Sequence, residues 1–210
     1  MNLFNKALDF IFPPVCGICG KIAENYLCKE CKDKLALIVK STYDEKCFHF
    51  WLYKYDDIRS LILRYKFNEC SYLYITISEL ILYDEKARAI LNKSDYIISV
   101  PIHKRRRYER GYNQCELIAK RLSDKTENLE YLSNVLAKKK NIVPQSTLSK
   151  EDRINNIRDA FYIKNRIDLT NKTVILLDDI YTTGSTVGEC IKVLKTLNYK
   201  SIYVFTIAKK

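Results

Sequence analysis

Two adjacent carboxylates followed by a run of small hydroxyl residues form the most chemically informative segment of the chain. Asp178 and Asp179 directly follow the apolar run 173–177. Hydroxyls and the backbone N–H groups at the start of a following helix predict an anion-binding loop, in which Gly184 lets the backbone approach a phosphate closely. Acidic side chains beside such a loop repel phosphate but suit sugar hydroxyls or Mg²⁺. The segment therefore predicts a ribose 5-phosphate site, against the alternative of a capped helix after a buried strand. The loop residues are Thr182, Thr183, Gly184, Ser185 and Thr186.

Four cysteines near the N-terminus form a second candidate site. Cys16 and Cys19 make one C-x-x-C pair, and Cys28 and Cys31 make another after eight intervening residues. Four thiolates satisfy the tetrahedral coordination of a structural zinc ion and leave no open position for catalysis. Two disulfides, free core thiols and an iron–sulfur cluster are the alternatives. We expect the scattered remainder to be small core residues, namely Cys47, Cys70, Cys115 and Cys190.

The elements that must position these residues alternate between strands and helices. Apolar strands without in-and-out alternation, separated by helices, predict an α/β fold with a mostly parallel sheet flanked by helices. We divide the chain into an N-terminal helix and zinc-binding module over residues 1–45 and a sheet domain over residues 46–210. We expect strands at 48–53, 96–100, 173–177 and 201–207, and helices at 3–12, within 54–92, at 113–122 and at 186–197.

Composition excludes several classes of protein. The 210 residues are 47% hydrophobic and 12% aromatic, which is too apolar for a disordered chain. No uncharged apolar run approaches the roughly 18–20 residues of a membrane-spanning helix. The N-terminus also lacks a signal-peptide pattern, so we expect a cytoplasmic protein. The net charge of +11 indicates an anionic partner such as nucleic acid, phosphates or a membrane surface, unless the host proteome is simply rich in lysine.

Most of this positive charge lies in two segments. Residues 104–110 hold five basic residues and one acidic residue, and residues 138–166 hold eight basic and three acidic residues. Such clustering favours a polyanionic partner, and Tyr108 and Tyr112 beside the arginines suit stacking with single-stranded nucleic acid. Any single lysine can instead be solvated, and the arginines can face outward. The nucleic-acid-binding candidates are Arg105, Arg106, Arg107, Lys138, Lys139, Lys140 and Arg153.

The segment V-I-L-L-D-D-I-Y-T-T-G-S-T, residues 174–186, resembles the phosphoribosyl diphosphate (PRPP) signature of type I phosphoribosyltransferases. Residues 13–207 as a whole resemble the ComF family, whose members join a four-cysteine zinc motif to such a domain. Three further stretches carry this resemblance: S-V-P-I-H (99–103) with R-G-Y-N-Q (110–114); Gln145, Leu148, Arg153, Asn156, Ala160 and Phe161; and Ile58 and Arg59 with Lys66.

The resemblance implies a type I phosphoribosyltransferase-like fold with assigned roles. It implies that the loop 182–186 holds the 5-phosphate of PRPP and that Asp178 and Asp179 bind the ribose hydroxyls. Mg²⁺ would bridge ribose and pyrophosphate, and Arg110 and Gly111 would hold the pyrophosphate. If the domain catalyses transfer, Asp178, Asp179 and Arg110 are its catalytic residues. His103 is expected to position the backbone, with general acid–base catalysis as the alternative.

The same resemblance implies a cytoplasmic protein of DNA uptake that handles single-stranded DNA and binds PRPP or DNA phosphates. A DNA translocase of the uptake machinery is the implied partner, and through it the protein would be associated with the membrane. One alternative is an active phosphoribosyltransferase in nucleotide salvage or a related pathway. Another is a zinc-dependent adaptor that docks such a translocase. No segment indicates a nucleobase acceptor or the N-terminal cysteine nucleophile of a glutamine amidotransferase.

Overall fold

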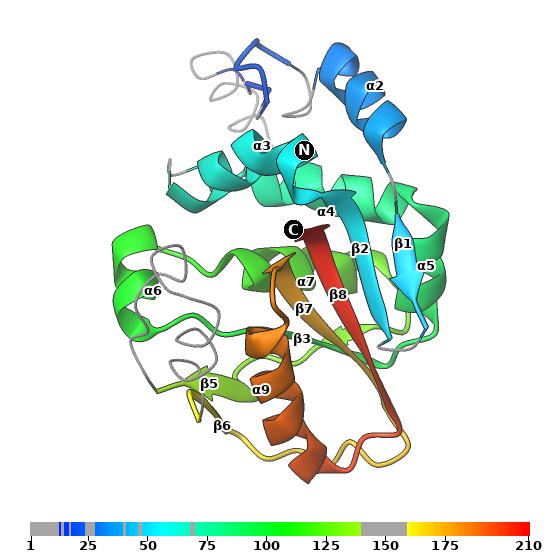
Figure 1. The fold of residues 1–210 in the computed structure, drawn as a ribbon, viewed down its shortest axis with the longest axis vertical. Coiled ribbons are helices and arrows are strands. Elements are labelled where there is room, and N and C mark those ends of the chain that lie inside the picture. The colour runs from blue at the N-terminus through cyan, green and yellow to red at the C-terminus, as the bar shows by residue number, and fades with distance from the viewer. Residues whose placement is uncertain are drawn as a thin grey trace, which may run out of the picture.

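A six-stranded sheet forms the centre of the molecule in the computed structural model, which describes residues 13, 15–16, 18–23, 28–39, 41–45, 48–67, 70–139 and 159–210. The strand order is β1-β2-β8-β7-β3-β4 (Figure 1). Only β1 and β2 pair antiparallel, and the other four pairings are parallel, which confirms the predicted mostly parallel sheet. The strands are β1 (Thr42–Asp44), β2 (His49–Lys54), β3 (Tyr96–Ser99), β4 (Glu130–Tyr131), β7 (Thr173–Tyr181) and β8 (Ser201–Lys209).

The central strand β7 is longer than its apolar run. We expected a strand that ends at Leu177, but β7 stays paired with β8 as far as Tyr181 and Lys209. Ile180 and Tyr181 have high strand propensity, and each finds a partner on β8. Asp178 and Asp179 therefore lie within a rigid strand.

Helices cover both faces of the sheet, as a parallel sheet with apolar strands requires. On one face, helices including α3 and α7 pack on a core that contains Phe50, Leu177 and Phe205. On the other face, α9 packs on a smaller core that contains Leu176 and Val204. The helices are α3 (Tyr55–Phe67), α4 (Leu73–Tyr83), α5 (Glu85–Asn92), α7 (Gln114–Lys125) and α9 (Ser185–Leu194), followed by the 3-10 turn η2 (Lys195–Leu197).

The basic segment after β3 forms helix α6 (Lys104–Arg110), where we expected a loop. Arginine, lysine and glutamate are good helix formers. The His103 side chain caps the start of α6 by accepting a hydrogen bond from the backbone N–H of Arg105 at 3.2 Å. Gly111, at φ +80°, ends α6 in the left-handed conformation. His103 thus has the backbone-positioning role that we expected of it.

Strands β5 and β6 form a second, two-stranded sheet outside the six-stranded one. β5 (Leu136–Lys138) pairs antiparallel with β6 (Phe161–Ile163), and both pack beside α9 in the smaller core. This hairpin joins the two ends of the segment 140–158, which lies outside the described residues, as does the helix expected at 3–12.

The N-terminal part packs against the main fold. Helix α2 (Lys29–Ile38) begins directly after Cys28, and its Leu35 is buried in the larger core. Arg64 of α3 donates a hydrogen bond to the carbonyl oxygen of Ile18 at 3.1 Å. The division at residue 45 stays a prediction, although β1, which lies before it, is already part of the main sheet. In the described parts of the chain, no helix has the length and apolarity needed to cross a membrane.

Candidate functional site

A cavity of about 650 Å³ lies at the carboxyl ends of β3, β7 and β8. Open α/β sheets bind their ligands at this edge. The lining comes from segments far apart in the sequence, among them α3, α6, α7, β5 and the loop between β7 and α9. Nine of the residues singled out from the sequence meet there: Arg106, Arg110, Lys138, Asp178, Asp179, Thr182, Gly184, Ser185 and Thr186.

The two carboxylates in the cavity have different surroundings. Lys66 of α3 forms a 2.7 Å ion pair with Asp179, and both side chains are less than one-fifth exposed. Asp178 accepts a hydrogen bond from the backbone N–H of Asp179 at 2.9 Å. Burial and then the charge of Asp179 raise the pKa of Asp178 to about 7, against the opposing effects of that hydrogen bond, Lys66 and Lys138. One carboxyl is therefore poised to exchange a proton near neutral pH, while its neighbour is held by an ammonium group.

The ion pair between Lys66 and Asp179 was not predicted from the sequence. The residue entered only as part of a family resemblance, without a role. Its partner Asp179 lies 113 positions further along the chain, so no local spacing signals the ion pair.

The loop between β7 and α9 has the shape of an anion site. Its Gly184 has φ +76°, and a Cβ at this position would lie 2.8 Å from Cζ of Tyr181. The Thr183 hydroxyl lies 2.8 Å from the Ser185 hydroxyl and 3.4 Å from the Ser185 backbone nitrogen, so Thr183 braces the loop and does not line the cavity. Helix α9 begins at Ser185, and the first N–H groups of a helix have no partner within it.

Cations from α6 and β5 complete the lining. The guanidinium of Arg110 lies 5.4 Å from the ring centroid of Phe67, and burial lowers the pKa of Arg110 while Asp179 opposes the shift. Lys138 of β5 lies with its ammonium 5.1 Å from the Phe161 ring centroid, and burial and then Arg106 lower its pKa. Burial makes the charged forms of these cations less favourable and a bound anion offsets that cost, so these cations favour a phosphate-bearing ligand.

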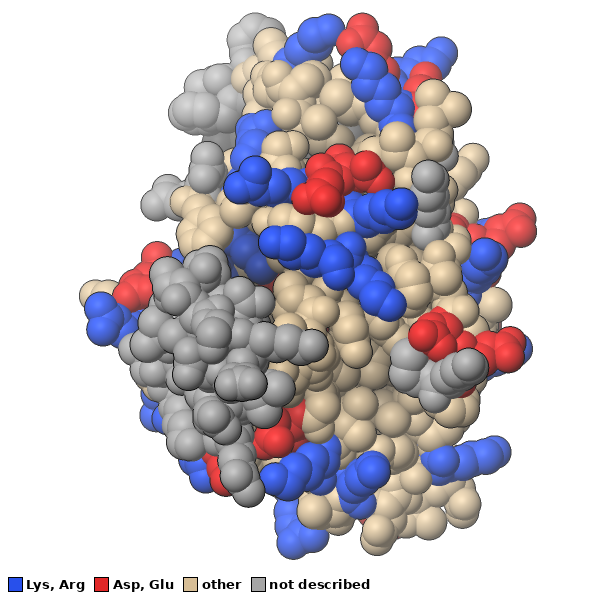
Figure 2. Space-filling model, in the orientation of Figure 1, with Lys and Arg blue, Asp and Glu red and all other residues tan. Residues whose placement is uncertain are grey.

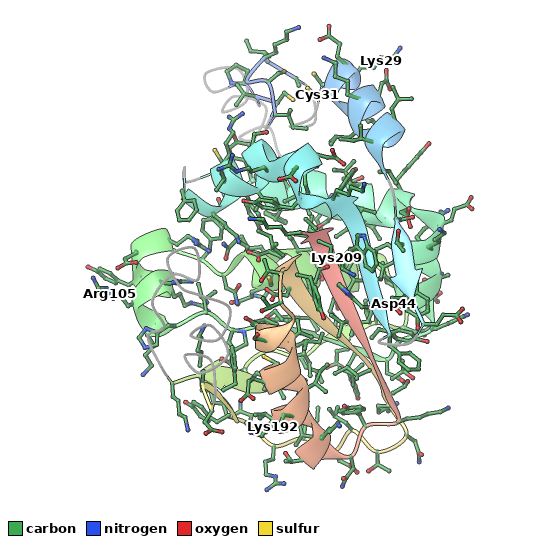
Figure 3. The ribbon with its side chains drawn as sticks, in the orientation of Figure 1. Lys29, Cys31, Asp44, Arg105, Lys192 and Lys209 are labelled. Carbon is green, nitrogen blue, oxygen red and sulfur yellow. The ribbon has the colours of Figure 1, made fainter. Side chains whose placement is uncertain are left out.

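Several predicted residues do not reach the cavity. Arg105 pairs with Glu109 at 2.8 Å and Arg107 with Glu116 at 2.9 Å, and both arginines are exposed on α6. Figure 3 shows Arg105 on the outer side of α6, away from the sheet. Neither Lys139 nor Gly111 lines the cavity. Lys140 and Arg153 lie outside the described residues.

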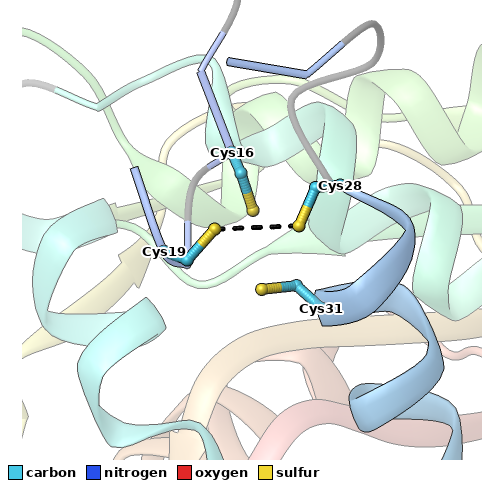
Figure 4. Close-up of side chains that lie close together, drawn as sticks. All are labelled: Cys16, Cys19, Cys28 and Cys31. Carbon is cyan, nitrogen blue, oxygen red and sulfur yellow. Dashed lines mark hydrogen bonds between the residues drawn. The ribbon is translucent and has the colours of Figure 1, made fainter. Parts of the chain in front are cut away.

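The four N-terminal cysteines converge on one point (Figure 4). All four Sγ atoms lie within 4.8 Å of one another, and those of Cys19 and Cys28 are 3.7 Å apart. Bonds of about 2.3 Å in a tetrahedral zinc site require sulfurs about 3.8 Å apart. Although burial opposes ionisation, backbone N–H groups of Cys19, Cys28 and Ile18 bring the pKa of Cys16 down to about 6. The cluster therefore fits a structural zinc ion without an open coordination position.

The cysteines outside this cluster fit the expectation of core residues where they are described. Cys70, Cys115 and Cys190 are buried thiols. Cys115 also lines the cavity, with its Sγ 4.0 Å from Oδ1 of Asp178. Cys47 lies outside the described residues.

Two family models match the chain, one on each predicted module. The double zinc ribbon domain matches residues 7–47, and the phosphoribosyl transferase domain matches residues 111–210. The first match contains all four clustered cysteines, and the second contains the acidic pair and the anion loop.

Curated relatives resemble much of the chain. Competence protein F of Haemophilus influenzae is 30% identical over 204 residues, which cover 93% of this chain and 85% of that protein. DNA utilization protein YhgH of Escherichia coli is 28% identical over 71% of this chain and 66% of its own length. Competence protein ComFC of Streptococcus pneumoniae is 27% identical over 56% of this chain and 49% of its own length.

Solved structures show a weaker likeness. A purine phosphoribosyltransferase from Pyrococcus horikoshii has a TM-score of 0.37 and 18% identity, over 68% of this chain and 82% of that one. A hypoxanthine phosphoribosyltransferase from Staphylococcus aureus has a TM-score of 0.37 and 14% identity, over 68% of this chain and 65% of that one. Scores this low carry no information about the ligand.

Proposed function

Because this chain belongs to the ComF family, we propose that it is a protein of DNA uptake that binds PRPP with Mg²⁺ and single-stranded DNA at its phosphoribosyltransferase-like site. The observation that carries the proposal is the cavity itself. It combines an acidic pair for hydroxyls or a metal ion, a helix start for a phosphate, and half-buried cations for further anionic groups. A sugar with phosphates at both ends has this distribution of chemical groups.

The proposed pose follows from charge. The 5-phosphate lies on the N–H groups from Gly184 to Thr186, because a helix start favours anions. The ribose hydroxyls face Asp178 and Asp179, whose carboxylates would repel a phosphate. The pyrophosphate lies toward Arg110, and Mg²⁺ supplied with PRPP offsets part of its charge.

Isothermal titration of PRPP with Mg²⁺ tests this pose. We expect the double variant Asp178→Asn and Asp179→Asn to weaken PRPP binding at least about tenfold, since one lost charged hydrogen bond is worth about 1.5–3 kcal/mol. Asp124→Asn, on the exposed surface of α7, is the matched control and should bind as the wild type does. Equal binding by the double variant would exclude this pose.

DNA binding is tested by titrating labelled oligothymidylate at several salt concentrations. Phosphate contacts release counterions, so we expect the affinity to fall steeply as salt rises. Absence of binding at low salt would refute this half of the proposal.

An active phosphoribosyltransferase is the second candidate function. The observation that favours it is the Asp178 carboxyl, whose pKa of about 7 suits proton transfer at neutral pH. In displacement at the anomeric carbon, Arg110 would stabilise the departing pyrophosphate. Pyrophosphate release from PRPP across a panel of nucleobases is the assay. If PRPP binds but no base leads to pyrophosphate release, the domain binds PRPP without catalysing transfer.

A zinc-dependent adaptor is the third candidate, with a DNA translocase as its partner. Such a protein would lie in the cytoplasm and meet the membrane through that partner. The zinc-binding cluster supports this reading because it leaves no position open for catalysis. Gel filtration with a candidate translocase, with and without chelator, separates it from the first two: an adaptor should lose the complex when the metal is removed.

A further inference from the structure

A second surface with rings and cations lies next to the cavity. It is formed by the carboxyl ends of β2, β7 and β8 and the first residue of α3, none of which belongs to the two basic segments singled out from the sequence. We call it the aromatic–lysine strip, and it consists of Trp51, Lys54, Tyr55, Tyr181, Lys209 and Lys210.

Rings and ammonium groups alternate along this strip. The Nζ atom of Lys209 lies 3.9 Å from the ring centroid of Trp51 and 5.6 Å from that of Tyr181. Lys210 lies with its Nζ atom 5.9 Å from the ring centroid of Tyr55. Lys54 is the register partner of Lys209 on the neighbouring strand. The strip therefore places three positive charges among three aromatic rings.

A buried histidine holds two of these rings in place. His49 packs against Trp51 and Tyr181, with centroid distances of 5.0 and 4.1 Å, and its Nε2 lies 2.9 Å from the Thr206 hydroxyl. Burial and then Lys209 lower the pKa of His49 to about 4, so its ring is neutral at pH 7. The charge of the strip thus comes from its lysines, and the rings rest on a fixed, uncharged support.

The strip is continuous with the cavity. Tyr55, Tyr181 and Lys210 belong to the strip and also line the cavity. The backbone N–H of Lys210 donates to the carbonyl oxygen of Tyr181 at 2.9 Å, which fixes the end of β8 against β7. Figure 2 shows a band of lysine and arginine side chains across the same region, and Figure 3 shows Lys209 at the carboxyl end of β8.

We propose that the aromatic–lysine strip is the track along which single-stranded nucleic acid leaves the cavity. Lys209 turns from the Trp51 ring to a phosphate, a base stacks on Trp51 in its place, and Lys54 and Lys210 pair with neighbouring phosphates. Alternating rings and cations match the repeat of base and phosphate along an unpaired strand. Asp56 and Asp57, exposed in the first turn of α3, would repel a broad anionic surface such as a membrane but not a strand that passes beside them. This inference rests on the proposed function.

Trp51 gives a direct test because it is the single tryptophan of the chain. We expect oligothymidylate to quench its fluorescence as the strand binds, since a stacked base quenches an indole. The double variant Lys209→Gln and Lys210→Gln should bind about tenfold more weakly at low salt. Two lost phosphate contacts should also reduce the slope of log affinity against log salt by about 1.4. The control is Lys195→Gln with Lys200→Gln, an equal charge change at the opposite end of β8 that should leave binding unchanged.

The outcomes separate the strip from the proposed function. Binding seen by fluorescence anisotropy with unchanged Trp51 emission, and with wild-type affinity in the Lys209 and Lys210 variant, would overturn the strip and leave the proposed function standing. Absence of any binding at low salt would overturn both. Anionic lipid vesicles that quench Trp51 more strongly than oligothymidylate at the same ionic strength would assign the strip to a membrane surface.

Discussion

Asp178 lies where its charged form is electrostatically unfavourable. Burial and the adjacent Asp179 both disfavour its charged form, and Asp178 directly follows four buried apolar residues of the same strand. Groups with such strongly shifted pKa values concentrate at functional sites. At the residue scale, this shift has a measurable consequence for stability.

We predict that Asp178→Asn stabilises the protein at pH 8. An acid whose folded pKa is raised from 3.8 to about 7 lowers the free energy of unfolding as the pH rises through that range, because the folded state binds more protons. Removing the charge should add on the order of 2–4 kcal/mol at pH 8 and less than about half as much at pH 5. Urea denaturation at both pH values measures this, and an equal effect at both would contradict the shift.

Lys66→Met should destabilise the protein, because it leaves the carboxylate of Asp179 without its partner in a mostly buried setting. We expect a loss of about 2–3 kcal/mol in the free energy of unfolding at pH 7. Lys120→Met is the control, since Lys120 pairs with Glu116 on the surface at 3.5 Å and should contribute less than about 0.5 kcal/mol. Equal effects of the two substitutions in urea denaturation would show that the Lys66 pair is not structural.

Site residues that lie together in one segment of the sequence could be predicted, and those brought together only by the tertiary fold could not. Asp178, Asp179 and the anion loop lie in one continuous segment, where an apolar strand must deliver them to a sheet edge. Lys66 and the strip residues Trp51 and Lys209 meet only through the tertiary fold. Arg105 and Arg107 were predicted from charge alone. Each pairs with a glutamate, Arg105 with Glu109 on the same helix and Arg107 with Glu116 on α7, and their role in nucleic-acid binding stays a prediction.

At the scale of elements, the junction between β7 and α9 positions the anion loop. The strand ends at Tyr181 and the helix begins at Ser185, so three residues must reverse the chain. Gly184 makes this possible with its positive φ and its close approach to Tyr181. The backbone turn between β7 and α9 therefore depends on Gly184.

We predict that Gly184→Ala weakens PRPP binding at least about tenfold, because the new Cβ would clash with the Tyr181 ring and strain the backbone. Gly188→Ala on α9 is the matched control, since nothing lies within 4 Å of its added Cβ. That control should keep PRPP binding and gain up to about 1 kcal/mol of stability. Titration calorimetry checks both, and wild-type affinity in Gly184→Ala would remove the loop from the binding site.

The elements that sequence reasoning missed are short or depend on distant partners. α6 was expected as a loop because its residues lack an apolar face, yet His103 and Gly111 cap a surface helix there. β4 and β5 have two and three residues, too few for a periodic pattern. The long apolar strands were predictable because both faces of the sheet are covered, which leaves no polar alternation.

At the scale of the whole molecule, the zinc ribbon is attached to the main core and is not an independent appendage. Leu35 is buried in the larger core, and Arg64 bonds to the carbonyl oxygen of Ile18. Metal binding to the four cysteines should therefore contribute to the stability of the chain beyond the ribbon.

Cys16→Ser should lower the zinc content well below about one ion per chain, since a tetrahedral site needs all four thiolates. We expect the N-terminal module to loosen while the sheet keeps its circular dichroism signal. Cys70→Ala, a buried cysteine outside the cluster, is the control and should retain its zinc. Wild-type zinc content in Cys16→Ser, measured by atomic absorption, would refute the ligand assignment.

Part of the net charge of +11 is concentrated at one edge of the sheet. Among the described residues, five cations line the cavity and Lys209 lies beside it; the five are Lys66, Arg106, Arg110, Lys138 and Lys210. Positive charge from distant segments therefore gathers at one edge of the sheet, where it raises the local concentration of anionic ligands. We propose that both PRPP and a nucleic-acid strand bind at this edge.

The most direct test of the central claim is a crystal structure of the protein soaked with PRPP and Mg²⁺. We predict the 5-phosphate on the backbone N–H groups of Gly184 to Thr186, the ribose hydroxyls at Asp178 and Asp179, and the pyrophosphate near Arg110. A ligand bound elsewhere, or a cavity that stays free of PRPP at saturating concentration, would contradict it.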